Sequence, residues 1–171
     1  MKGIVILLLG LMECHQKAPE QAQALMYTTD ATKEYVGTVT FKDTEAGLQV
    51  GVQLWHIPTG EHGFHIHVYP DCGAQVDAFG EKQPALKAGG HYDPNETHKH
   101  LGPNNNGHLG DLPVIQANAL GDVDMCVYAP RLTVADVVGR SVIVHAGGDN
   151  YQDTPFPLGG GGKRIVCGVI E

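Results

Sequence analysis

Short stretches in which apolar and polar residues alternate set the fold class of this 171-residue chain. From Leu48 to Leu54 every second residue is Leu or Val, with Gln or Gly between them. Successive side chains of a strand point to opposite faces, so this alternation predicts a strand with one buried face. Similar apolar patterns recur at 64–68, 123–127, 142–144 and 165–170.

Helical signals are weak by comparison. No stretch of helix length combines an amphipathic pattern with a cap, and residues 132–138 predict one turn at most. Several short strands separated by Gly- and Pro-rich turns are typical of a sandwich or barrel. Since the length also suits one domain, we expect a single all-β domain over residues 25–171.

The first 24 residues are expected to be an export signal outside the fold. Lys2 gives a positive start, and residues 3–12 form an apolar run too short to cross a bilayer. Ala22-Gln23-Ala24 fits a small-x-small cleavage pattern, which makes Leu25 the first mature residue. In the alternative, residues 11–14 are a lipoprotein signal and Cys14 is acylated, although Glu13 stands where that pattern has a small residue. Both interpretations place the protein outside the cytoplasm.

The charge of the chain argues against a nucleic-acid-binding function. The formal net charge is -8, and it is spread without long runs of one sign. A nucleic-acid-binding surface needs a basic stripe, which is not evident in this sequence.

Four cysteines bear on stability, because a compartment outside the cytoplasm permits disulfides. Export removes or modifies Cys14 and leaves three, which cannot all pair within the chain. Cys126 lies in a strand-like run and is expected to be a small buried residue. Cys72 follows a turn and Cys167 lies in the terminal strand, and these two are expected to pair.

Histidine is the unusual residue of this sequence, and most of the ten lie from His56 to His108. His65 and His67 are two apart on a predicted strand, so both imidazoles project from the same face. His145 ends another predicted strand. A set of imidazole nitrogens suits copper better than calcium or magnesium.

A second set of metal ligands lies in the loop 89–113, which has almost no apolar residues. Three imidazoles and one carboxylate make a closed tetrahedral zinc site. A loop without a core of its own gains order by binding a metal. The expected ligands are His91, His100, His108 and Asp111.

Taken together, six segments resemble the copper/zinc superoxide dismutases and occur in the family's order. The resemblance covers roughly residues 34–171, and Gly147-Gly148-Asp149 and residues 158–162 look like the bacterial, exported branch. It implies an immunoglobulin-like Greek-key β-sandwich or flattened barrel with long loops, and a periplasmic location. The segments are Gly-Phe-His-Ile-His at 63–67, then 90–94, 99–103, 107–113, 144–149 and 164–170.

The resemblance also implies a role for each site residue. Copper would be bound by His65, His67, His91 and His145, and zinc by His91, His100, His108 and Asp111, with His91 bridging the two metals. Asp149 would hold His67 and His100 from behind, and Arg164 would hold superoxide beside copper. Cys72 and Cys167 match the family disulfide. Lys163, Lys82 and Lys87 are further candidates for guiding the anion.

The implied reaction converts superoxide to dioxygen and hydrogen peroxide by alternating reduction and reoxidation of copper, with zinc structural. It would protect the cell envelope. The alternative is a non-catalytic copper carrier of the same fold, but such relatives lose copper ligands or the arginine, and all are present here.

Expected partners are superoxide and, only with a lipidated Cys14, a membrane. A monomer and a homodimer both remain open. His56, His62 and His98 are expected at the surface, and His15 in the export segment.

Overall fold

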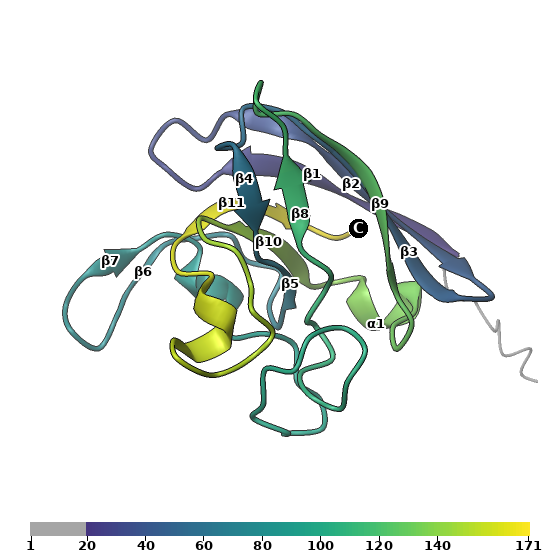
Figure 1. Cartoon of the computed structure of the whole chain (residues 1–171). Coiled ribbons are helices and arrows are strands. Elements are labelled where there is room, and N and C mark those ends of the chain that lie inside the picture. Colours follow the sequence, from purple (N-terminus) through teal and green to yellow (C-terminus); the bar gives the residue numbers. More distant parts are fainter. Residues whose placement is uncertain (1–19) are drawn as a thin grey trace, which may run out of the picture.

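The computed structural model of this protein describes residues 20–171. The apolar run 3–12, Cys14 and His15 lie outside the described residues, so the export signal and the lipidation of Cys14 stay predictions. The described chain consists mainly of strands joined by long loops (Figure 1). The strands are β1 (Gln21–Thr28), β2 (Tyr35–Thr44), β3 (Gly47–Leu54), β4 (Gly60–His62), β5 (Phe64–His67), β6 (Gln75–Val76), β7 (Lys82–Gln83), β8 (Ile115–Ala117), β9 (Val123–Ala129), β10 (Ser141–His145) and β11 (Arg164–Val169).

Seven of these strands form one curled antiparallel sheet in the order β5-β10-β11-β1-β2-β3-β9 (Figure 1). The chain passes between the two edges of this sheet after β3, after β5 and after β9. A separate pair, β4 and β8, packs against the same core through residues of β8. The expected all-β class is therefore confirmed.

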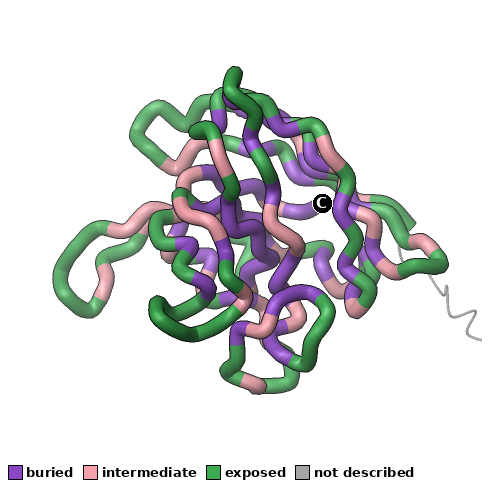
Figure 2. The backbone as a smooth tube through the Cα atoms, in the orientation of Figure 1, coloured by how far each residue is buried: buried purple, intermediate pink, exposed green. Residues whose placement is uncertain are grey.

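The predicted alternation in β3 is confirmed and builds the core. Leu48, Val50, Val52 and Leu54 are all buried, and in the neighbouring strands Val52 pairs with Val39 and Val50 with Val127. Full burial of one such side chain contributes about 1.5–3 kcal/mol. Figure 2 shows the buried segments gathered inside the curled sheet and the exposed ones at its turns.

The structured chain begins before Leu25, the expected first mature residue, and the domain boundary at Leu25 stays a prediction. β1 begins at Gln21, and Ala24 is buried and pairs with Val39 of β2. The small residues that resemble a cleavage pattern also alternate with glutamines, so they fit a strand whose small side chains face the core. Where the signal is cut stays a prediction.

Three long segments outside the main sheet, residues 69–90, 89–113 and 146–163, are largely loops. Residues 69–90 contain the short β6–β7 hairpin and a 3₁₀ turn, η1 (Leu86–Ala88), while 146–163 contain η2 (Pro157–Gly160). Residues 89–113 form no named strand. The expected single turn near 132–138 is α1 (Val134–Val137), which Asp136 and Thr133 cap reciprocally. No helix within residues 20–171 is long and apolar enough to cross a membrane.

Cys126 is exposed, contrary to the expectation that it is buried. Val123 and Val127 of β9 face the core, and Cys126 falls on the opposite side together with Asp124 and Tyr128. Cys72 and Cys167 form the disulfide that was expected, with their Cα atoms 5.8 Å apart.

Candidate metal centre

Two adjacent strands place three of the histidines in the interior. His65 and His67 lie on β5, opposite Ile143 and Ser141 of β10, and both are fully buried. His145 ends β10 immediately after a register shift at Val144, and such irregularities re-aim side chains. Its ring therefore reaches His67, with 3.4 Å between the two Nε2 atoms.

The free edge of β5 carries the loop that holds the other candidate ligands. Ile66 donates its N–H to Gly110 O and accepts a hydrogen bond from Tyr92 N, at 2.9 and 2.8 Å. These bonds place His91 beside His67 and Asp111 beside His65, as two isolated bridges. The loop therefore brings its ligands to the strand that carries the first set.

The structure brings the predicted copper set together. One potential ligand atom from each of His65, His67, His91 and His145 lies within 4.8 Å of the others, and all four residues are buried. A second group shares His91 and also contains His65, His100 and Asp111. Both groups could hold a metal ion; His65 and His91 belong to both, and the predicted zinc ligand His108 is in neither.

Three histidines of the first group each use one ring nitrogen in a hydrogen bond, and the other ring nitrogen points toward the cluster. His65 Nε2 contacts Asp149 Oδ2 at 2.7 Å, His67 Nδ1 contacts Gly89 O at 3.0 Å, and His145 Nδ1 contacts Gly162 O at 3.1 Å. The opposite nitrogen of His65, Nδ1, is buried without a hydrogen-bond partner. Buried polar atoms rarely lack a partner, and an outer hydrogen bond that orients a metal-binding imidazole is the usual arrangement. These residues therefore fit a metal.

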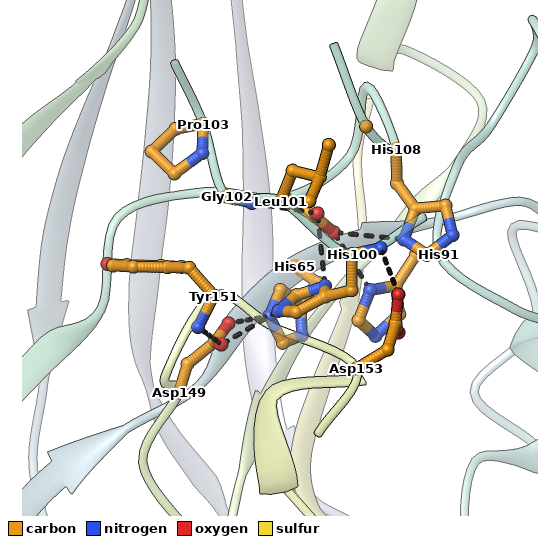
Figure 3. A network of polar contacts seen from close by, with 12 residues as sticks. His65, His91, His100, Leu101, Gly102, Pro103, His108, Asp149, Tyr151 and Asp153 are labelled. Atoms are coloured by element: carbon orange, nitrogen blue, oxygen red, sulfur yellow. Dashed lines mark hydrogen bonds and ion pairs between the residues drawn. The ribbon is translucent and has the colours of Figure 1, made fainter. Parts of the chain in front are cut away.

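The second group centres on the carboxylate of Asp111. Its oxygens lie 2.9 Å from His91 Nδ1, 3.0 Å from His100 Nδ1 and 3.4 Å from His108 Nδ1. The Nδ1 atoms of His100 and His108 are buried and make no hydrogen bond. Ligands of a tetrahedral zinc ion lie about 3.3 Å apart, given zinc–ligand distances of about 2.0–2.1 Å. The donor set therefore fits zinc, although His108 Nδ1 lies further from the Asp111 carboxylate than the Nδ1 atoms of His91 and His100. Figure 3 shows these three histidines close together.

Burial controls the charge of these groups. It lowers the pKa of His65 and His67 well below the ordinary value, and that of His145 to about 4, with the neighbouring imidazoles acting in the same direction. Burial alone would also lower the pKa of His100, but its contacts with Asp111 and Asp149 raise it to about 9. Neutral imidazoles keep the lone pair that a metal needs.

Asp149 links the two groups, but not through the pair that was expected. Its Oδ2 contacts His65 Nε2 and its Oδ1 contacts His100 Nε2, both at 2.7 Å (Figure 3). His67 is held by a backbone carbonyl instead. The correction follows from β5, because His65 and not His67 lies next to the end of β10 that leads to Asp149.

Arg164 lies beside the first group. Its guanidinium donates to Ala85 O and Gly89 O, both at 2.7 Å, and Gly89 O also contacts His67 Nδ1. Arg164 lines a groove of about 1310 Å³ together with Lys82, Lys87 and Lys163, the other residues expected to guide an anion. Lys87 is 3.9 Å from Asp71, which offsets part of its charge.

His62 is a site residue that the sequence analysis missed. It is buried, and its Nδ1 and Nε2 lie 2.7 and 2.6 Å from His145 O and Pro58 O. It therefore supports the backbone of a copper-group residue. The expectation that His62 lies at the surface was wrong. The signal was present, since His62 has the same parity as Phe64 and Ile66, which face inward. His56 and His98 are exposed, as expected.

The chain matches the family described as "Copper/zinc superoxide dismutase (SODC)" over residues 35–170. It is 53% identical over 137 residues to a superoxide dismutase [Cu-Zn] of Brucella abortus biovar 1 (strain 9-941), covering 80% of this chain and 79% of that protein. It is 42% identical over 170 residues to a superoxide dismutase [Cu-Zn] of Escherichia coli (strain K12), covering 99% and 98%.

A solved structure shows the same arrangement. The Cu/Zn superoxide dismutase from Brucella abortus superposes with a TM-score of 0.86 at 48% identity, over 89% of this chain and 100% of that one. Sequence and fold agree over most of both proteins. This chain therefore belongs to the copper/zinc superoxide dismutase family, with copper and zinc as its cofactors.

Proposed function

We propose that this protein dismutates superoxide at the first histidine group, with His65, His67, His91 and His145 as copper ligands. His91, His100, His108 and Asp111 bind zinc in this proposal. The observation that carries it is the pair of adjoining buried donor groups, between which His91 lies with its Nδ1 2.9 Å from Asp111. Bound copper would supply one-electron oxidation and reduction, so that two superoxide ions and two protons give dioxygen and hydrogen peroxide.

The residues around the metals have separate roles in the proposal. Arg164 binds the anionic substrate, since its guanidinium stays charged and is fixed by the carbonyls of Ala85 and Gly89, the second of which also contacts His67. His91 directs Nδ1 toward Asp111 and so turns Nε2 toward the copper group, where that atom can hold and deliver a proton. Asp149 keeps His65 and His100 in place.

We also propose that the protein acts in the cell envelope, where it removes superoxide outside the cytoplasm. The apolar run at 3–12 and the Cys72–Cys167 disulfide support this location, because disulfides persist in oxidising compartments. The strand that begins at Gln21 favours processing before that residue over a cut after Ala24. Mass spectrometry of the mature protein from cell fractions would give both the processing site and any lipid on Cys14.

His145→Ala tests the proposed reaction. His145 belongs only to the first group, so the variant should keep about one zinc per chain while losing copper and superoxide-dependent dye reduction. Metal analysis of wild type and variant accompanies the assay. Loss of both metals would show that His145 is misassigned. A wild type that binds copper and zinc but does not dismutate superoxide would favour the copper-carrier alternative.

A further inference from the structure

Arg131 contacts the loop that carries the zinc ligands and has no role in the site as described so far. Its guanidinium donates to four backbone carbonyls and reaches them from outside the loop. The acceptors are Pro103 O (3.0 Å from Nε), Gly107 O (3.3 Å from Nη1), and Gly102 O and His108 O (3.5 and 2.7 Å from Nη2).

The four acceptors lie on two limbs of the loop. Residues 102–103 form one limb and 107–108 the other, with Asn104–Asn106 between them. Gly102 donates its N–H to Asp111 Oδ2 at 3.3 Å while its carbonyl accepts from Arg131. The shortest bond of the set goes to the carbonyl of His108, a proposed zinc ligand. One side chain thus joins both limbs at the level of the zinc group.

The backbone of Arg131 is itself anchored in the core of the curled sheet. It follows the end of β9 and precedes Leu132, which is buried in the core. Two residues further, Val134 donates its N–H to Asp43 Oδ1 of β2 at 2.7 Å, and α1 begins. The guanidinium is therefore attached to the rigid part of the fold and not to the loop that it contacts.

Arginine suits this position, because its planar fork offers five donors in fixed directions. Lysine would bring the same charge to one point and could not span both limbs. We propose that Arg131 is a positioning residue that holds the loop 102–108 in its zinc-binding arrangement before zinc arrives. The inference rests on the proposed zinc set. If only part of the metal-free population has the binding arrangement, the apparent dissociation constant for zinc rises as that fraction falls.

The test compares Arg131→Met and Arg131→Lys with wild type and with Lys42→Met, which removes one charge from an exposed position on β2. Zinc affinity is measured by competition with a chromophoric chelator on copper-free protein, and amide hydrogen exchange of 102–108 is measured on metal-free protein. Arg131→Met should bind zinc at least tenfold more weakly and exchange faster at 102–108 than wild type. Exchange in β3 and β9, copper affinity and the Lys42→Met variant should stay near wild type.

Arg131→Lys separates the fork from its charge. We expect Arg131→Lys to resemble Arg131→Met. Wild-type zinc affinity in Arg131→Lys would overturn the proposed positioning role of the guanidinium in favour of simple attraction to Asp111. Zinc affinity of Arg131→Met within twofold of wild type, or unchanged exchange at 102–108, would also overturn it. If Arg131→Met does not fold, the lysine variant carries both measurements. A wild type that binds no zinc would refute the zinc assignment instead, while hydrogen exchange would still test the positioning role of the guanidinium.

Discussion

Asp149 is the residue on which both metal groups depend, because each of its carboxylate oxygens holds a histidine from a different group at 2.7 Å. It is also enclosed by the loop that follows it. A Cβ atom on Gly159, which has a φ of +71°, would run into the carboxylate of Asp149 and the ring of His100. The glycine-rich segment lets the chain close over this link.

Asp149→Asn should weaken the binding of at least one of the two metals. An amide keeps one acceptor oxygen but directs an NH₂ group at the other imidazole N–H, so one of the two histidines loses its support. Loss of such outer hydrogen bonds typically costs about 10–100-fold in metal affinity. Copper and zinc affinities are measured separately, with Asp124→Asn on the exposed face of β9 as the control. An Asp149→Asn protein that keeps both wild-type affinities would contradict this role.

The pKa values predict that metal-free protein is most stable near neutral pH. The pKa of His145 is about 4 when folded and about 6.5 when unfolded, so the unfolded chain takes up more protons as the pH falls through that window. His145 alone then costs on the order of 3 kcal/mol of stability by pH 4. His100 has the opposite sign, since its pKa is raised to about 9 and its stabilisation is lost as the pH rises from about 6.5 through 9.

Urea unfolding of chelator-treated protein from pH 4 to 9 checks this expectation. The free energy of unfolding should reach its maximum near pH 6.5 and decline on both sides. His145→Ala should flatten the acid limb, because the variant lacks one group that is buried in the neutral form. A stability that stays constant between pH 4 and 6.5 would contradict the direction of these shifts.

For single residues, the sequence predicted which side chains belong to the site better than it predicted the contacts between them. The three residues His65, His67 and His145 could be assigned to one group because strand geometry fixes where alternate side chains point. The partner of Asp149 could not, since it depends on which residue of β5 pairs nearer the C-terminal end of β10. Arg131 gave no signal either, because four backbone carbonyls leave no trace in a sequence.

Among the elements, the loop 68–90 is attached to the sheet by two different means. The disulfide joins Cys72 to Cys167 of β11, and Arg164 of the same strand donates to Ala85 O and Gly89 O. Ala85, Ala88 and Ile143 pack around the disulfide as a small buried cluster. The loop that supports His67 through Gly89 thus depends on β11 for its position.

Reduction of Cys72–Cys167 should lower stability more than it lowers the activity of molecules that stay folded. The bridge closes a segment of 95 residues, for which the chain-entropy model gives about 4–5 kcal/mol. Thermal unfolding of oxidised and reduced protein measures the loss, with Cys126→Ser as the control that should melt like wild type. Alkylation of the native protein should label Cys126 alone among residues 20–171, and labelling of Cys72 would show that the pair is open.

Element predictions succeeded where one face of a strand is buried and failed where other signals competed. β3 and β9 alternate clearly, and both were predicted. β1 was set aside because its small residues also resemble a cleavage site. β4 and β8 are three residues each, too short for a period-two pattern to stand out.

For the whole molecule, the net charge opposes the proposed substrate. The chain carries a formal net charge of -8, and superoxide is an anion, so the average field repels it. Rapid catalysis then needs a local positive region. Arg164 shares the acceptor Gly89 O with His67 of the copper group, and it lines a groove together with Lys82, Lys87 and Lys163. Exposed charges act over about 8–10 Å at physiological ionic strength, so only nearby cations can offset the field.

Arg164→Glu should therefore keep both metals and the copper spectrum yet lose at least tenfold in activity, about 1.4 kcal/mol or more. Arg164→Lys should keep a good part of the activity, because the positive charge remains. Lys42→Glu makes the same change of charge on β2, away from the groove, and should act like wild type.

Steady-state rates between low and high salt complete the test. Wild type should slow as salt screens the attraction, while Arg164→Glu should slow less or speed up, since screening then reduces repulsion. Equal activity and equal salt dependence in Arg164→Glu and wild type would mean that Arg164 does not guide superoxide, even if dismutation itself is confirmed.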